Sequence, residues 1–225
     1  MKREWILMGA VLAATGAQAQ IPSKSTTDDA PRAHGVPGNP PAAAASRILT
    51  CEGLFGEKAT HAKMTEAFGA ANVTFDKQDG AEGETYMGTT LFKKKPADRL
   101  IVNWKDEKRR ATPDSIVARI DAPAPASNWH LPNGLRPGSS LAEVEAANGK
   151  AFALSGFEWD YGGYVNDWKG GSLAKGAGPC NISIRFSPGP AAKTDKVSGD
   201  AKFLSSDPRM KAAKPFVSDI TVSRK

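Results

Sequence analysis

The apolar residues of the first half predict one helix followed by four strands. Met64, Ala67 and Phe68 recur at i, i+3 and i+4, the spacing of one face of a helix over residues 60–68. Gly69 follows at the place where a helix would stop. Apolar runs separated by polar turns then predict strands over residues 72–75, 85–92, 99–104 and 115–121.

The second half repeats this order with clearer signals. Ser140 and Glu143 have the spacing of a capping box, and Gly149 is suited to end a helix in the left-handed conformation. A helix is therefore predicted over residues 140–148. Strands are predicted over 151–157, 180–186 and 216–223, and a short helix near Ser206-Asp207-Pro208.

A run of aromatic residues surrounds two adjacent glycines. Gly162-Gly163 predicts a two-residue hairpin turn, because both central positions of such a turn need positive φ. That register pairs Tyr161 with Tyr164, Trp159 with Asn166 and Phe157 with Trp168, all on one side of the ribbon. In the alternative, the glycines form a bulge in one long strand, and this pairing is lost.

Together these elements predict an α+β fold of two tandem units. Each unit would be one helix packed on a roughly four-stranded antiparallel sheet, because one helix can cover the single apolar face of such a sheet. Pro123 and Pro125 separate the units, which would span residues 47–125 and 126–225. The similar order of the two halves suggests an internal repeat.

The first 19 residues are typical of a secretory signal peptide rather than of the fold. They comprise a Lys2-Arg3 head, a short apolar run and an Ala17-Gln18-Ala19 cleavage pattern. An ordinary buried helix is the alternative. Residues 20–46 are rich in Pro and Ala without periodicity, and we expect a disordered leader. The mature protein would be secreted, or periplasmic in a cell with an outer membrane, with no integral membrane segment.

Cysteine count and charge limit the chemistry further. In an oxidising compartment, Cys51 and Cys180 predict a structural disulfide, with two reactive thiols as the alternative. The net charge is +6 with acids and bases well mixed, so a nucleic-acid partner is not expected. The 3 histidines form no metal-binding motif, and neither a nucleophile elbow nor a phosphate-binding loop is present. We therefore predict no metal site, no cofactor and no catalytic residues.

Two functions remain open for the aromatic segment. Exposed tryptophan and tyrosine beside acids suit a protein or cell-envelope partner, and the predicted binding residues are Trp159, Asp160, Tyr161, Tyr164 and Trp168. The same rings could instead pack beneath the helix as core. The alternative function is a cell-envelope hydrolase using the carboxylates of Glu158, Asp160 and Asp167.

Residues 135–152 resemble the helix-opening signature of the SmpA/OmlA-type envelope proteins. Gly138, Ser140, Glu143, Val144 and Gly149 fit that signature. The resemblance implies a helix-on-sheet unit, which the beta-lactamase inhibitory protein has twice. The SmpA/OmlA group is lipid-anchored through a cysteine, and here Gln20, not cysteine, comes directly after the cleavage pattern. Residues 48–186, with their Trp-Asp-Tyr-Gly-Gly segment, also resemble a group of uncharacterised bacterial secreted proteins, which implies no activity.

Overall fold

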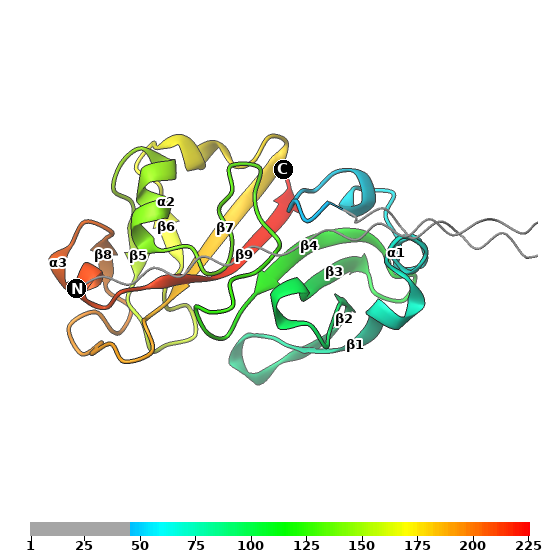
Figure 1. Ribbon diagram of the computed structural model, residues 1–225, viewed down its shortest axis with the longest axis horizontal. Coiled ribbons are helices and arrows are strands. Elements are labelled where there is room, and N and C mark those ends of the chain that lie inside the picture. Colours follow the sequence, from blue (N-terminus) through cyan, green and yellow to red (C-terminus); the bar gives the residue numbers. More distant parts are fainter. Residues whose placement is uncertain (1–45) are drawn as a thin grey trace, which may run out of the picture. The chain divides into compact units, whose positions relative to one another are not determined.

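Two antiparallel sheets carry most of the α+β fold in Figure 1, a computed structural model that describes residues 46–225. The larger sheet has six strands in the order β1-β2-β3-β4-β9-β7, and the smaller has three in the order β6-β5-β8. The strands of the first half are β1 (Val73–Asp79), β2 (Thr85–Leu91), β3 (Leu100–Asp106) and β4 (Ala111–Arg119). Those of the second half are β5 (Ala153–Ser155), β6 (Val165–Asp167), β7 (Cys180–Ser187), β8 (Lys202–Leu204) and β9 (Phe216–Arg224).

Within residues 46–225, each of the three α-helices begins after an N-cap side chain that accepts a backbone hydrogen bond. In α1 (His61–Phe68), the Thr60 side chain accepts from the backbone N–H of Lys63. In α2 (Leu141–Asn148), Ser140 and Glu143 form the complete capping box, and Gly149 closes the helix with a φ of 77°. In α3 (Pro208–Ala212), Asp207 is the N-cap. The predicted helices over residues 60–68 and 140–148, the short helix near Pro208 and the Ser140–Glu143 capping box are therefore confirmed.

The two halves of the chain join along β4 and β9. These strands pair antiparallel from Ser115↔Ser223 to Arg119↔Asp219. On its other edge β9 pairs with β7, so the last strand of the chain lies inside the sheet and not at its margin. Figure 1 shows β9 running between β4 and β7.

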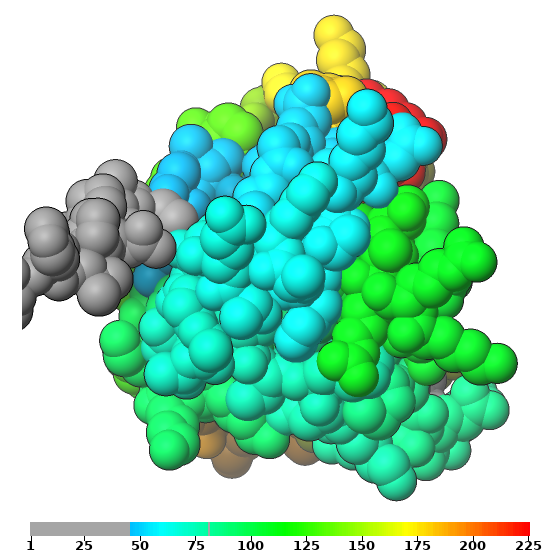
Figure 2. All heavy atoms as spheres, turned by 90° about the vertical axis from the view of Figure 1, so that its right-hand side faces the viewer, coloured from blue at the N-terminus to red at the C-terminus, as the bar shows by residue number. Residues whose placement is uncertain are grey.

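One face of the six-stranded sheet carries the core. Leu100, Ala118, Ile220 and Ile184 lie side by side on successive strands and are fully buried. Buried residues of α1 and α2 belong to the same cluster, so both helices cover this face. Figure 2 looks onto the end of the molecule at which α1 lies, with the cyan α1 segment across its middle. Because side chains alternate along a strand, the residues between these core positions point to the opposite face of the sheet.

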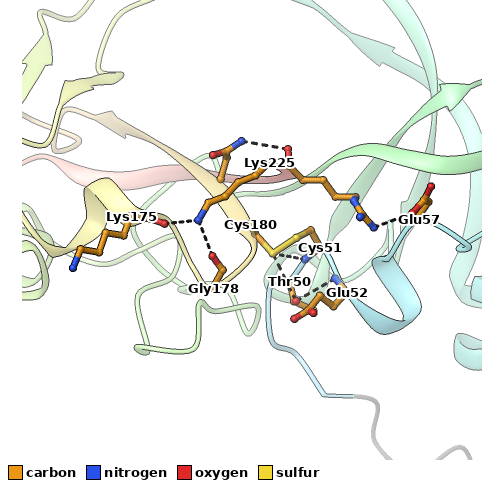
Figure 3. The surroundings of a disulfide bond; sticks show 10 residues. Thr50, Cys51, Glu52, Glu57, Lys175, Gly178, Cys180 and Lys225 are labelled. Carbon is orange, nitrogen blue, oxygen red and sulfur yellow. Dashed lines mark hydrogen bonds and ion pairs between the residues drawn. A yellow bond between two sulfur atoms is a disulfide. The ribbon is translucent and has the colours of Figure 1, made fainter.

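The disulfide between Cys51 and Cys180 is confirmed. It ties the segment before α1 to the first residue of β7, and both cysteines are buried (Figure 3). The end of β9 reaches the same place, where Lys225 Nζ donates to the carbonyl oxygens of Lys175 and Gly178, each at 2.8 Å.

The prediction of a two-residue hairpin turn at Gly162-Gly163 is wrong. Strands β5 and β6 do pair, with Leu154 opposite Val165, but a longer loop over residues 156–164 connects them. Glu158 adopts a φ of 66°, which turns the chain before Trp159 and Tyr161. Phe157 then bridges to Ser198 and does not face Trp168.

The described chain contains one strand that the sequence does not predict. Strand β8 is formed although no strand is predicted over residues 202–204. The signal peptide predicted over residues 1–19, and the leader up to residue 45, lie outside the described residues. Among the described residues, no helix is long and apolar enough to cross a bilayer.

Candidate functional site

The loop over residues 156–164 is held against strand β7 by its glycines. Gly163 N donates to Gly156 O at 3.0 Å, and Gly163 O accepts from Phe186 N at 2.9 Å. Gly163 has a φ of 76°, and a Cβ there would lie 1.9 Å from Phe186 O. Only glycine fits such a close backbone approach, so the sequence fixes where the loop meets the sheet.

Arg185 of β7 holds the tip of this loop through hydrogen bonds to its backbone. Its Nε donates to Gly162 O at 2.8 Å, and its Nη2 donates to Asp160 O at 3.4 Å. The guanidinium also lies 5.1 Å from the centre of the Tyr164 ring, within the range of a cation–π contact. Arg185 thus joins the loop backbone and Tyr164 to the face of the sheet opposite the core.

Trp159 and Tyr161 form an aromatic pair at the loop tip. Their ring centres are 5.6 Å apart in an edge-to-face arrangement. Trp159 Nε1 donates to Gly156 O at 3.1 Å, which fixes the indole. Tyr161 is 51 % exposed, the most exposed large hydrophobic residue among the described positions. The pair presents aromatic surface to solvent in a defined orientation.

A row of charged and aromatic side chains continues from the loop across the sheet. Tyr164 bridges to Arg185, Arg185 is opposite Asp219, and Asp219 is opposite Arg119. The Asp219 carboxylate forms an ion pair with Arg119 Nε and accepts a hydrogen bond of 2.7 Å from Ser218 Oγ. Burial alone would lower the pKa of Arg119, but the charge and hydrogen bond of Asp219 raise it above its usual value.

Tyr86 approaches the same row from strand β2. Burial is the main cause that raises the pKa of Tyr86, and Arg119 and Tyr164 lie close enough to act on it electrostatically. Ile101 and Val117 lie on this face and are each only 8 % exposed. We name this surface the tyrosine–arginine face; it comprises Tyr86, Arg119, Trp159, Tyr161, Tyr164, Arg185 and Asp219.

Trp168 lies apart from the other predicted binding residues. Its ring centre is 5.3 Å from that of Phe152, and its backbone oxygen accepts from Asn148 Nδ2 at 3.0 Å. Because Phe152 is fully buried, Trp168 packs against the core beside helix α2. The structure therefore brings together Trp159, Asp160, Tyr161 and Tyr164, and positions Trp168 elsewhere.

The three carboxylates of the hydrolase hypothesis have different surroundings. Glu158 Oε1 accepts from Thr194 Oγ1. Asp167 Oδ2 forms an exposed ion pair of 2.9 Å with Lys169, whose side-chain and backbone hydrogen bonds lower the pKa of that carboxyl. Asp160 is exposed. Within residues 46–225, no group of three or more His, Cys, Asp or Glu side chains is placed to hold a metal ion.

Sequence reasoning missed Tyr86, Arg119, Arg185 and Asp219. A usable signal was present, because Arg119, Arg185 and Asp219 each interrupt a strand of mainly apolar residues. A charged residue in such a strand lies on the face opposite the core or is paired. Their convergence depends on the β4-β9-β7 order, which the sequence does not reveal.

Comparisons of this chain with protein-family models, with curated proteins and with solved structures found no match.

Proposed function

We propose that the protein is a secreted, non-catalytic binding module whose tyrosine–arginine face contacts a protein of the cell envelope. One observation carries the proposal: the half-buried Trp159 and the exposed Tyr161 form an oriented ring pair on a loop whose backbone is held by Arg185, which also contacts the Tyr164 ring. Tryptophan, tyrosine and arginine are the residue types that contribute most to binding energy at protein interfaces.

The rigidity of this face supports the same function. Side chains ordered before binding lose less conformational entropy when the complex forms. The Trp159 indole, the loop backbone and the Arg185 guanidinium are each held by hydrogen bonds. Arg119 and Asp219 neutralise each other's charge, so a partner would meet mainly aromatic and arginine surface.

The test is a two-step binding measurement. A photoreactive phenylalanine analogue at position 161 would crosslink the partner in envelope extracts, and the partner would then be purified. We expect Tyr161→Ala and Arg185→Ala each to weaken its binding by about 2 kcal/mol, a roughly 30-fold rise in Kd. Leu204→Ala is the matched control, because Leu204 is 47 % exposed but lies in β8, outside the tyrosine–arginine face.

Unchanged melting temperatures would show that both variants fold. If the purified partner bound Tyr161→Ala, Arg185→Ala and Leu204→Ala equally well, the proposed surface would be wrong. Hydrolysis of an envelope polymer that Asp160→Asn abolishes, with the fold intact, would favour the hydrolase alternative.

We also propose that residues 47–125 and 126–225 are two helix-plus-sheet units. The order of elements supports this: α1 precedes β1 to β4, and α2 precedes β5 to β9, with α3 before the last strand. The units would join at the β4–β9 pair, through which β9 and β7 extend the sheet of the first unit, while β5, β6 and β8 form the smaller sheet. A location outside the cytoplasm is supported by the disulfide, since such bridges persist in oxidising compartments.

A further inference from the structure

A groove of about 780 Å³ lies between helix α2 and the segment that leads from α3 into β9. Leu141, Ala142, Glu145 and Ala146 line it on the α2 side, and Lys211, Lys214 and Pro215 line it on the other. Its volume is within the range of small-molecule sites in proteins, about 300–1,000 Å³. The tyrosine–arginine face contributes no residue to it.

The groove has an apolar floor because α2 exposes small residues on this side. Ala142 and Ala146 are exposed, and neither side chain is long enough to fill the space toward Pro215. At the start of α2, Leu141 N donates to Pro215 O at 3.3 Å and Ser140 bridges to Phe216. These backbone contacts tie the two walls of the groove to each other at the start of α2.

Three lysines, Lys150, Lys211 and Lys214, surround this floor against a single acid, Glu145. Within residues 46–225, none of the three ammonium groups has an ion pair or hydrogen bond with a carboxylate. Apolar surface beneath unpaired cations is complementary to a molecule with a hydrocarbon chain and an anionic head. We propose that this groove binds a single-chain amphiphilic carboxylate of the fatty-acid class.

The chemistry of such a ligand makes the proposal testable without knowing its source. Each buried methylene contributes about 0.8 kcal/mol when fully covered, so lengthening the chain must tighten binding. In an open groove with partial cover, two added methylenes should lower Kd about fivefold. The head must be anionic, because a cationic head would be repelled by three lysines.

The experiment titrates the protein by calorimetry with dodecanoate, kept below its micelle concentration. We expect a Kd below about 1 mM, tighter than for decanoate, and an upward shift of the melting temperature. Acetate supplies the head without the chain, and dodecyltrimethylammonium supplies the chain with the opposite charge. Neither should bind measurably.

Two variants locate the site. Lys150→Gln/Lys211→Gln should weaken dodecanoate binding about tenfold, because two cations of the rim are removed. Lys105→Gln/Lys108→Gln is the matched control, since it removes the same charge from exposed positions outside the groove. Ala146→Trp should block binding by filling the groove, and its circular dichroism and melting temperature would show that it folds.

Absence of dodecanoate binding to the protein would overturn the proposal. So would equal binding of dodecyltrimethylammonium, or an equal loss in the groove and control lysine variants. Dodecanoate binding that survives in folded Ala146→Trp would show that the ligand lies elsewhere, and would equally overturn it.

Discussion

At the residue scale, the Arg119–Asp219 ion pair is the main electrostatic feature of the sheet. The Asp219 side chain is 7 % exposed and that of Arg119 is 38 % exposed, so the pair is shielded on one side and wet on the other. A buried ion pair contributes little net stability, but removing one partner leaves a charge without compensation. Because the charges of Arg119 and Asp219 cancel, the pair keeps this part of the tyrosine–arginine face close to neutral.

We expect Asp219→Asn to destabilise the protein by about 2 kcal/mol, less than in a fully buried pair because water still reaches Arg119. Urea unfolding measures the change. Asp121→Asn is the control, because Asp121 is 82 % exposed in its pair with Arg99 and should lose less than about 0.5 kcal/mol. Equal losses in the two variants would contradict the distinction.

We expect His61 to make the stability of the protein depend on pH. Thr89 Oγ1 accepts a hydrogen bond from Trp104 Nε1 and lies 2.8 Å from His61 Nδ1. The Thr89 hydroxyl can therefore donate its own proton to His61 Nδ1 when the imidazole is neutral. Burial, and then the charge of Arg110, lower the pKa of His61 below 6.5. The unfolded chain therefore binds this proton at a higher pH than the folded one does.

The stability that His61 contributes to the folded state is fully present above about pH 6.5, and it is lost as the pH falls through the lower pKa of the folded state. We expect unfolding free energies measured at about pH 7.5 and about pH 5 to differ less in His61→Gln than in the unchanged protein. An unaltered pH dependence in that variant would mean that other groups cause it.

At the element scale, the loop over residues 156–164 depends on β7 for its conformation. Its backbone meets β7 at Gly163 and Phe186, and its tip is held by Arg185. The orientation of Trp159 and Tyr161 is therefore a property of the loop and the strand together.

Gly163→Ala should test this dependence, since the added methyl group would overlap Phe186 O. We expect a loss of about 3 kcal/mol in urea unfolding, combining left-handed strain with displacement of the loop. Gly170→Ala is the matched control: Gly170 has a φ of 69° but open space around its Cβ position, so about 1 kcal/mol is expected. If both variants lose the same amount, the contact with β7 does not hold the loop.

Elements defined by local chemistry could be predicted from the sequence, and those defined by distant contacts could not. The caps at Ser140 and Gly149 act within one turn of helix, so their residues are sufficient. The glycine pair at 162–163 predicts a tight hairpin by local rules, but Gly163 serves a contact with β7 instead. Likewise, Arg119 and Arg185 come together only through β9, which lies between their strands.

At the scale of the whole molecule, the disulfide connects the beginning of the described fold with its second half. Cys51 precedes α1, and Cys180 opens β7 in the second half (Figure 3). The bridge closes a separation of 129 residues. A crosslink over so long a stretch strongly restricts the unfolded chain.

We expect reduction of this bond to lower the unfolding free energy by about 5 kcal/mol in the chain-entropy model. Urea unfolding with and without reductant measures the loss, and Cys51→Ser/Cys180→Ser should reproduce the reduced protein. A double variant as stable as the oxidised protein would rule out this role of the bond.

The position of β9 between β4 and β7 also affects how the sheet is assembled. Strands β4 and β7 both need Phe216–Arg224 as their neighbour, yet these residues are translated after all the other strands. Until β9 is in place, the edges of β4 and β7 that it covers stay open for hydrogen bonding. We therefore expect a chain that lacks β9 to aggregate, because open strand edges favour association between chains.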